Sequence, residues 1–379
     1  MARPVIIDAI RTPYGKRGGQ LSGIHAVDLL STIQKAALDR VGLAPDEIDE
    51  VIGGCVTQAG EQSNNIARFA WLNAGFPTQT GGTTIDAQCG SGQQAVHLVA
   101  AQIAAGMSEV GLACGIEVMS RVPLQSNLAD GQFGYPRTPT WSVDLPAQYE
   151  GADRIAENRG FTREQLDEFG VRSQQRAARA WDAGYFDRQV VPVTLADGTV
   201  VSRDGGLRET SMAGLSGLKS IRDGGLHTAG TSSQLTDGAT AAVLMSEQRA
   251  NAAGLEPRGY ILAQCLIGGE PKYLLDGPVQ AAERLLQQSG LSIDDIDIFE
   301  VNEAFAAVPM SVAKVHGIDH DRLNVNGGAI ALGHPVGSTG IRLIANVLDE
   351  LERRGGRYGM ILTCAGGAMA AGTLIERAR

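Results

Sequence analysis

The feature that most constrains the fold of this chain is a weak internal duplication. Three landmarks occur twice in the same order, and each second copy lies 247–250 residues after the first. The pairs are residues 42–49 (GLAPDEID) with 290–297 (GLSIDDID), 90–91 (GS) with 337–338 (GS), and 110–115 (VGLACG) with 360–365 (MILTCA). One match alone would be a common helix-to-strand connector, whereas three collinear matches favour two copies of one structural unit. A length of 379 residues also favours two or three units over a single core.

Each copy alternates predicted strands and helices. Short apolar runs at residues 51–55, 83–85 and 298–301 predict buried strands, and residues 90–105 predict a buried helix. This alternation predicts a mainly parallel sheet covered by helices.

The segment between the copies differs from them in composition and predicted structure. Four prolines interrupt its first part, and a polar helix is predicted over residues 162–181, with Thr162 as N-cap and Gln165 three positions later. We therefore expect an inserted domain rather than a third copy. The expected division is an N-terminal α/β unit at residues 1–118 completed by residues 231–255, a loop domain at 119–230, and a C-terminal α/β unit at 256–379.

Charge and cysteine usage exclude several classes of protein. The net charge is -10, so nucleic acid is not expected as a partner. The chain has five cysteines and no CxxC pair, which argues against a disulfide framework or a zinc site and favours a reducing, cytoplasmic location. No apolar run is long enough to predict a membrane span.

The first candidate for chemistry is Cys89, in residues 88–92 (QCGSG), where a predicted strand turns into a predicted helix. Unpaired N–H groups and the dipole at a helix N-terminus favour a thiolate, so we expect a lowered pKa there. Taken alone, an isolated cysteine is more often a buried packing residue.

The second candidate is His334, in residues 324–340 (NVNGGAIALGHPVGSTG). Such a glycine-rich backbone is typical of a segment that places a side chain, and the following proline favours an extended conformation at the histidine. An imidazole held in this way could take a proton from a thiol.

The third and fourth candidates lie at strand ends. Cys364 ends a predicted strand, and Gly366 and Gly367 would expose N–H groups beside its thiol, as an oxyanion site requires. By the repeat, Cys364 corresponds to Cys114, so a plain core role is the alternative. Asn302 follows the strand at residues 298–301, where α/β sheets bind ligands, although it could equally be a helix N-cap.

Together, the segments CGSG, NEAF, GGAIALGHPVGSTG and CAGGAMAAG resemble the signature motifs of the thiolase family, and the resemblance covers essentially the whole chain. It implies an α/β thiolase fold, with two duplicated α/β units in a layered αβαβα arrangement plus a loop domain. It also implies an acyl-CoA C-acyltransferase that cleaves a 3-ketoacyl-CoA with coenzyme A through an acyl-cysteine intermediate, giving acetyl-CoA and a shortened acyl-CoA.

The resemblance also assigns roles. Cys89 would be the acylated nucleophile, His334 its base, and Cys364 the general acid/base. Asn302, through a water, would join His334 in a hole for the thioester enolate oxygen. The N–H groups of Cys89 and Gly366 would form a second hole for the tetrahedral intermediate.

The same resemblance implies coenzyme A as cosubstrate, with no tightly bound cofactor and no metal. The implied coenzyme A contacts are Gln148, Arg208, Ala229, Ser233, Ala304 and Phe305. For Arg208, a solvated surface charge is the alternative. A homo-oligomer, either a dimer or a dimer of dimers, is implied by residues 64–71 and the first copy's glycine-rich strand.

Substrate preference is indicated by a departure from one branch of the family. Short-chain acetoacetyl thiolases carry a His-Met pair where residues 145–152 read LPAQYEGA. Residues 207–215, 227–234 and 274–279 resemble thiolases of actinobacterial sterol side-chain degradation. We therefore expect a degradative enzyme, with steroid-CoA thioesters as candidate substrates. The alternatives are a biosynthetic acetoacetyl-CoA thiolase and a non-catalytic acyl-CoA or sterol carrier; a ketoacyl-synthase-type enzyme would need a histidine in place of Cys364.

Overall fold

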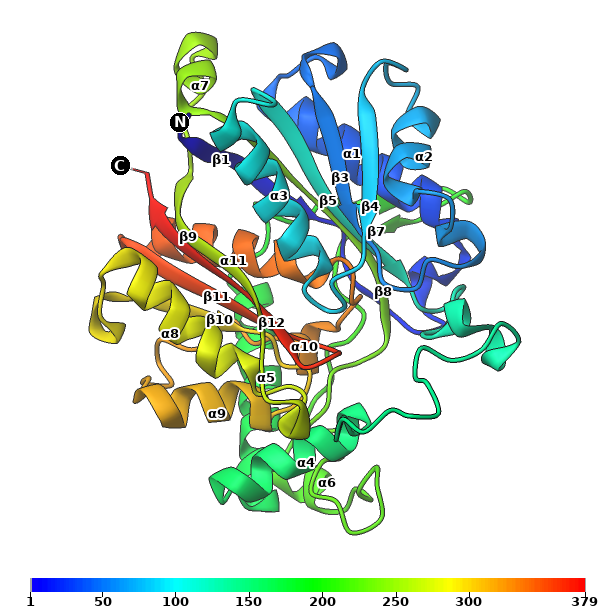
Figure 1. The fold of residues 1–379 in the computed structure, drawn as a ribbon, viewed down its shortest axis with the longest axis vertical. Coiled ribbons are helices and arrows are strands. Elements are labelled where there is room, and N and C mark those ends of the chain that lie inside the picture. Colours follow the sequence, from blue (N-terminus) through cyan, green and yellow to red (C-terminus); the bar gives the residue numbers. More distant parts are fainter. Residues whose placement is uncertain (1, 379) are drawn as a thin grey trace.

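The two copies form the two halves of one ten-stranded sheet (Figure 1). The computed structural model describes residues 2–378. The strand order is β10-β11-β12-β9-β1-β8-β5-β3-β4, and β2 (Gly15–Lys16) pairs with β8. The first half contains β1 (Pro4–Arg11), β3 (Glu50–Gly54), β4 (Gly81–Ile85), β5 (Val110–Val118) and β8 (Thr236–Ser246). The second contains β9 (Gly259–Gly268), β10 (Ile298–Val301), β11 (Tyr358–Ala365) and β12 (Met369–Arg377). The halves repeat the same order outward from the central β1–β9 pair.

Helices complete the five layers that the sequence predicts. Their bounds are α1 (Ala26–Val41), α2 (Ile66–Asn73), α3 (Ser91–Ala105), α7 (Glu247–Ala253), α8 (Gly277–Ser289), α9 (Ala307–His316) and α11 (Thr339–Arg354). Apolar residues of α1 and α2 pack on the outer face of the first half, and those of α8 and α9 on the outer face of the second. Between the halves, α3 and α11 form the middle layer. The predicted α/β class and αβαβα layering are confirmed.

Strand direction follows the connections. The expected parallel pairing occurs where helices carry the chain back, between β3 and both β4 and β5 and between β10 and β11. The remaining pairs are antiparallel, including β11 with β12, which a short turn joins directly. The alternation of strands and helices predicts parallel pairing only between strands that a single helical crossover connects, and β8, β9 and β12 have no partner strand connected to them in this way.

The insert contributes α4 (Gln148–Arg159), α5 (Arg163–Asp182), α6 (Met212–Ser216) and the hairpin of β6 (Val193–Thr194) and β7 (Val200–Val201). The predicted cap is confirmed, because Thr162 accepts from the N–H of Gln165 and the Gln165 side chain accepts from the N–H of Thr162. In this domain α4 packs against α9, and α5 against α10 (Ala329–Leu332). Across residues 2–378, every helix is too short or too polar to span a membrane.

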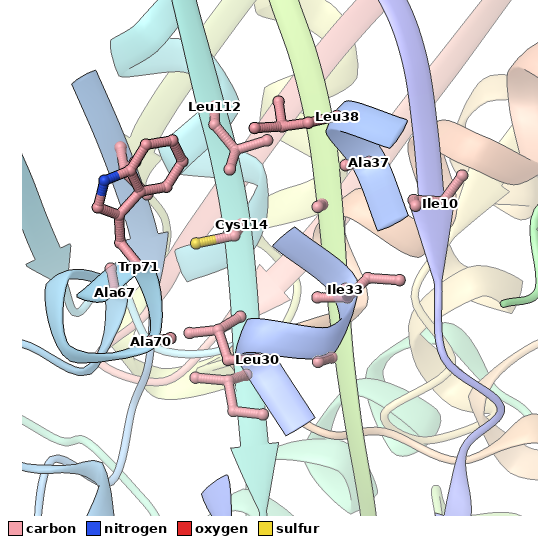
Figure 2. Packing of buried hydrophobic residues seen from close by; sticks show 14 of the residues in the cluster. Ile10, Leu30, Ile33, Ala37, Leu38, Ala67, Ala70, Trp71, Leu112 and Cys114 are labelled. Carbon is pink, nitrogen blue, oxygen red and sulfur yellow. The ribbon is translucent and has the colours of Figure 1, made fainter. Parts of the chain in front are cut away.

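Cys114 is a core residue. Its thiol lies on β5 among apolar side chains of α1 and α2, including Leu30, Ala67 and Trp71 (Figure 2). Complete burial raises its pKa to about 12. The repeat partner of Cys364 is therefore a packing residue, which leaves the position of Cys364 to be judged from its own surroundings.

Candidate functional site

The segments singled out from the sequence converge on a cavity of about 820 Å³. Cys89, His334 and Gly366 line this cavity, as do four of the predicted coenzyme A contacts, Gln148, Ser233, Ala304 and Phe305. Within the described residues, Asn302, Cys364, Arg208 and Ala229 are not part of its lining. The first two lie behind the lining and contact it through hydrogen bonds, which are described below.

A tight turn places Cys89 at the base of the cavity. Between β4 and α3, Gln88 adopts a left-handed conformation with φ 53°. The hydroxyl of Ser91 closes this turn, because it accepts from the N–H of Ala87 at 2.9 Å and donates to the carbonyl of Gln88 at 2.6 Å. The predicted position at a helix N-terminus is confirmed, and the Cys89 side chain is held where only 5% of the residue is exposed.

The predicted lowering of the Cys89 pKa is wrong. Burial raises the pKa of this thiol to about 11, although the N–H groups of Gly366 and of Cys89 itself oppose the rise. The helix N-terminus is too weak an influence to offset the loss of water around a fully enclosed thiolate. Cys89 therefore rests as a neutral thiol and needs a base before it can attack.

His334 has the geometry of such a base. Its Nδ1 lies 2.6 Å from the hydroxyl of Thr339, which donates its own proton to the carbonyl of Pro335 at 3.1 Å. Thr339 must then accept from Nδ1–H, so Nε2 carries the lone pair and accepts from Asn302 Nδ2 at 3.2 Å. Burial, together with the charge of Arg342, lowers the pKa of His334 to about 3, so the imidazole is neutral and can accept a proton.

Cys364 and Asn302 form a buried pair behind the cavity. Burial raises the pKa of the Cys364 thiol, and the proximity of Cys89 raises it further. The side chain of Asn302 and the N–H of Ala304 oppose this rise. Asn302 thus acts on the second thiol as well as donating to the imidazole, and its fully buried Oδ1 has no hydrogen-bond partner within residues 2–378.

Gly366 brings a backbone N–H to the first thiol. A Cβ at this position would lie 2.9 Å from the side-chain oxygen of Gln88, so a larger residue would require the Gln88 side chain to move. The backbone N–H groups of Gly366 and of Cys89 itself favour negative charge on the Cys89 sulfur. Donors fixed in this way can stabilise negative charge on an oxygen that develops next to that sulfur.

The predicted coenzyme A contacts meet in two groups. The N–H of Ser233 donates to the carbonyl of Ala304 at 2.9 Å, and Ser232 forms an isolated β-bridge with Phe305. Separately, the exposed Arg208 places Nη2 3.4 Å from the carbonyl of Ala229. Among the described residues, no group of three or more His, Cys, Asp or Glu side chains could hold a metal ion.

Glu117 is a site residue that the sequence reasoning missed. This completely buried carboxylate accepts from the N–H groups of Val56, Thr57 and Gly337 at 3.0–3.1 Å and from Gln62 Nε2 at 2.9 Å. It therefore fixes the loop that carries His334 against the end of β3. The available signal was a single acidic residue in an otherwise apolar strand.

Comparisons with known proteins agree with the residue pattern. The model of the thiolase N-terminal domain matches residues 4–248, and that of the thiolase C-terminal domain matches residues 255–377. The chain is 42% identical to a steroid 3-ketoacyl-CoA thiolase of Mycobacterium tuberculosis, covering 100% of this chain and 95% of the relative. It is 41% identical to a beta-ketoadipyl-CoA thiolase of Escherichia coli, with both chains covered completely.

Solved structures give the same result. The acetyl-CoA acetyltransferase of Bacillus anthracis superposes with a TM-score of 0.92 at 37% identity, covering 100% of this chain and 99% of the other. Human mitochondrial 3-ketoacyl-CoA thiolase superposes with a TM-score of 0.90 at 33% identity, covering 99% of each chain.

Proposed function

The chain belongs to the thiolase family, and we propose that four of its residues, Cys89, His334, Asn302 and Cys364, carry out the cleavage of a 3-ketoacyl-CoA by coenzyme A. The observation that supports this most is their arrangement: the Cys89 thiol and a neutral imidazole line one cavity, and Asn302, which donates to that imidazole, also acts on the second thiol. The test is release of acetyl-CoA from a 3-ketoacyl-CoA and coenzyme A by the purified protein, with Cys89→Ala as the inactive control.

The first half-reaction uses Cys89 and His334. Nε2 of His334 takes the thiol proton while the sulfur attacks the C3 carbonyl, and the N–H groups of Cys89 and Gly366 stabilise the resulting oxyanion. The C2–C3 bond then breaks, leaving the acyl group on Cys89 and an acetyl-CoA enolate. Once protonated, Nε2 changes from acceptor to donor, so it can release Asn302 and bond to the enolate oxygen.

Cys364 supplies the remaining proton transfers. Its raised pKa keeps a proton on the sulfur, which is then available for C2 of the enolate. In the second half-reaction, the Cys364 thiolate takes the proton of coenzyme A, whose sulfur attacks the acyl-Cys89 thioester. The shortened acyl-CoA leaves, and both cysteines regain their protons.

Coenzyme A is placed by the insert and by the segment after β10. We propose that residues 119–230 form the loop domain. Its last residues, together with residues 231–233 and 304–305, hold the pantetheine of coenzyme A, and the exposed Arg208 attracts one of its phosphates. The Ser233–Ala304 hydrogen bond supports this, because it unites two of the proposed contact segments. Loss of affinity for coenzyme A in Arg208→Ala, with the rate at saturation unchanged, would test it.

For the acyl group we propose a bulky, steroid-derived chain. The cavity holds about 820 Å³ and takes apolar lining from Leu124, Leu128, Trp141 and Tyr149 of the insert, among others. The 42% identical relative is named as a steroid thiolase, which supports the same substrate class. A kinetic panel of acetoacetyl-CoA, a long straight chain and a sterol side-chain 3-ketoacyl-CoA would test the preference.

We also propose a cytoplasmic homo-oligomer, formed across β4. This strand is an edge of the sheet, and on the adjacent α2 the side chains of Phe69 and Leu72 are exposed by 52% and 41%. An unpaired edge with apolar neighbours is suited to pairing with a second copy. Light scattering that gave a monomer of 39.7 kDa would overturn this proposal.

A further inference from the structure

The cavity that contains Cys89 has one charged side chain in its lining. Among the described residues around it, that side chain is Arg137, and neither Asp nor Glu is present. The chain as a whole has 42 acidic and 32 basic residues, so acidic side chains outnumber basic ones overall but not in this lining. The exposed Arg137 thus lies at the cavity without a neutralising carboxylate among the lining residues.

Two contacts fix the position of Arg137 at the cavity wall. Its Nη2 donates to the carbonyl of Leu145 at 3.0 Å, and its guanidinium carbon lies 5.6 Å from the ring centroid of Trp141. The indole of Trp141 is itself held by a 2.9 Å hydrogen bond from Nε1 to the carbonyl of Val143. A planar guanidinium has five N–H donors, so these contacts leave most of the fork free to bind another group.

Neutral hydrogen-bonding side chains lie in the same part of the chain. Gln125, Asn127 and Tyr135 also line the cavity, and apart from Arg137 the other lining residues within 119–147 are hydrophobic. An apolar pocket with a few polar groups and one cation is suited to a ligand whose body is hydrocarbon and which carries one negative charge.

We propose that Arg137 binds a carboxylate on the acyl group, so that the preferred substrates are 3-ketoacyl-CoA thioesters whose acyl chain ends in a carboxylate. This inference rests on the proposed thiolase function and adds a terminal carboxylate to the bulky acyl group proposed above. A carboxylate matches the guanidinium fork and can accept two parallel hydrogen bonds from it. A methyl-terminated chain of the same length would leave the cation unpaired beside an apolar ligand.

The test compares substrates in matched pairs. Each pair has a 3-ketoacyl-CoA ending in a carboxylate, such as 3-oxoadipyl-CoA, and a methyl-terminated partner of equal length, such as 3-oxohexanoyl-CoA. Pairs of six, eight and ten carbons would identify the length that spans the cavity. For that length we expect kcat/KM to favour the carboxylate by about tenfold or more, because hydrogen bonds to charged groups contribute at this level.

The variants Arg137→Met and Arg203→Met separate this role from general effects of charge. Arg203 is an exposed arginine outside the cavity lining, paired with Asp182. In Arg137→Met the carboxylate-terminated member should lose more kcat/KM than its methyl-terminated partner, so that the preference disappears, and Arg203→Met should keep the preference. The wild-type preference should also weaken as ionic strength rises.

Two results would overturn the proposal. An equal loss on both members of each pair in Arg137→Met would assign Arg137 to a phosphate of coenzyme A, which all these substrates share. The absence of any preference in the wild type would show that the cation does not select the acyl group. In contrast, if neither member of any pair released acetyl-CoA, the thiolase function and this inference would fail together.

Discussion

The substitution Glu117→Gln tests how the site is held together. One of the two carboxylate oxygens becomes an NH₂ group, which then faces two N–H donors instead of accepting from them. A hydrogen bond to a charged group contributes about 1.5–3 kcal/mol, so the loss of two amounts to about 3–6 kcal/mol. This loss should lower the free energy of unfolding. Where the NH₂ group replaces Oε2, it faces the N–H groups of Val56 and Gly337 and should displace Gly337 together with the loop of His334.

The catalytic consequence should exceed the loss of stability. A displacement of about 1 Å in a reacting group can reduce the rate by about 10²-fold, so we expect kcat to fall by about that factor. The KM for coenzyme A should change little, since Ser233 and Ala304 are held by other contacts. Steady-state kinetics at a temperature where the variant is folded, together with denaturant unfolding, would measure both effects.

Leu29→Ala is the matched control for this experiment. Leu29 is completely buried between α1 and the sheet, so its truncation should destabilise the protein by about 2–5 kcal/mol. Its kcat per folded molecule should remain that of the wild type. If Glu117→Gln were destabilised but kept its kcat in the same way, Glu117 would be a structural residue only.

Three further predictions concern the chemistry and the substrate. Cys364→Ala should reduce turnover by about 10²–10⁴-fold while Cys89 can still be acylated, and a smaller loss would make Cys364 a packing residue. Because the pKa of His334 is about 3 and that of Cys89 about 11, neither group titrates near neutrality, so kcat/KM should be constant from about pH 6 to 9. A change of kcat/KM with pH in this range that disappears in His334→Gln would contradict the assigned protonation states. Bulky 3-ketoacyl-CoAs should exceed acetoacetyl-CoA in kcat/KM, since each buried methylene contributes about 0.8 kcal/mol, and equal efficiency would refute the bulky substrate but not the family.

Much of the fold could be predicted because local pattern and the repeat agree. The strand at residues 298–301 and the cap at Thr162 follow from apolar runs and capping chemistry, which depend on neighbouring residues. The antiparallel pairing of β8, β9 and β12 depends on contacts between distant strands, and no short pattern specifies it.

The site residues also divide into those that neighbouring sequence predicts and those that depend on contacts between distant segments. Cys89 and His334 were found from glycine-rich segments whose composition indicates a placed side chain. Glu117 acts through Gly337, 220 residues away in sequence, and the pKa of Cys89 depends on how completely the folded protein encloses it. Both are properties of packing, so a prediction from helix position alone gave the wrong direction for the thiol.

The most direct test of the central claim is to identify the residue that carries the acyl group. The protein would be incubated with a 3-ketoacyl-CoA without free coenzyme A, and its peptides would be analysed by mass spectrometry. The account predicts one equivalent of acetyl-CoA released and an acyl adduct on Cys89, discharged when coenzyme A is added. An adduct on Cys55 or Cys114, or acetyl-CoA release that persists in Cys89→Ala, would contradict it.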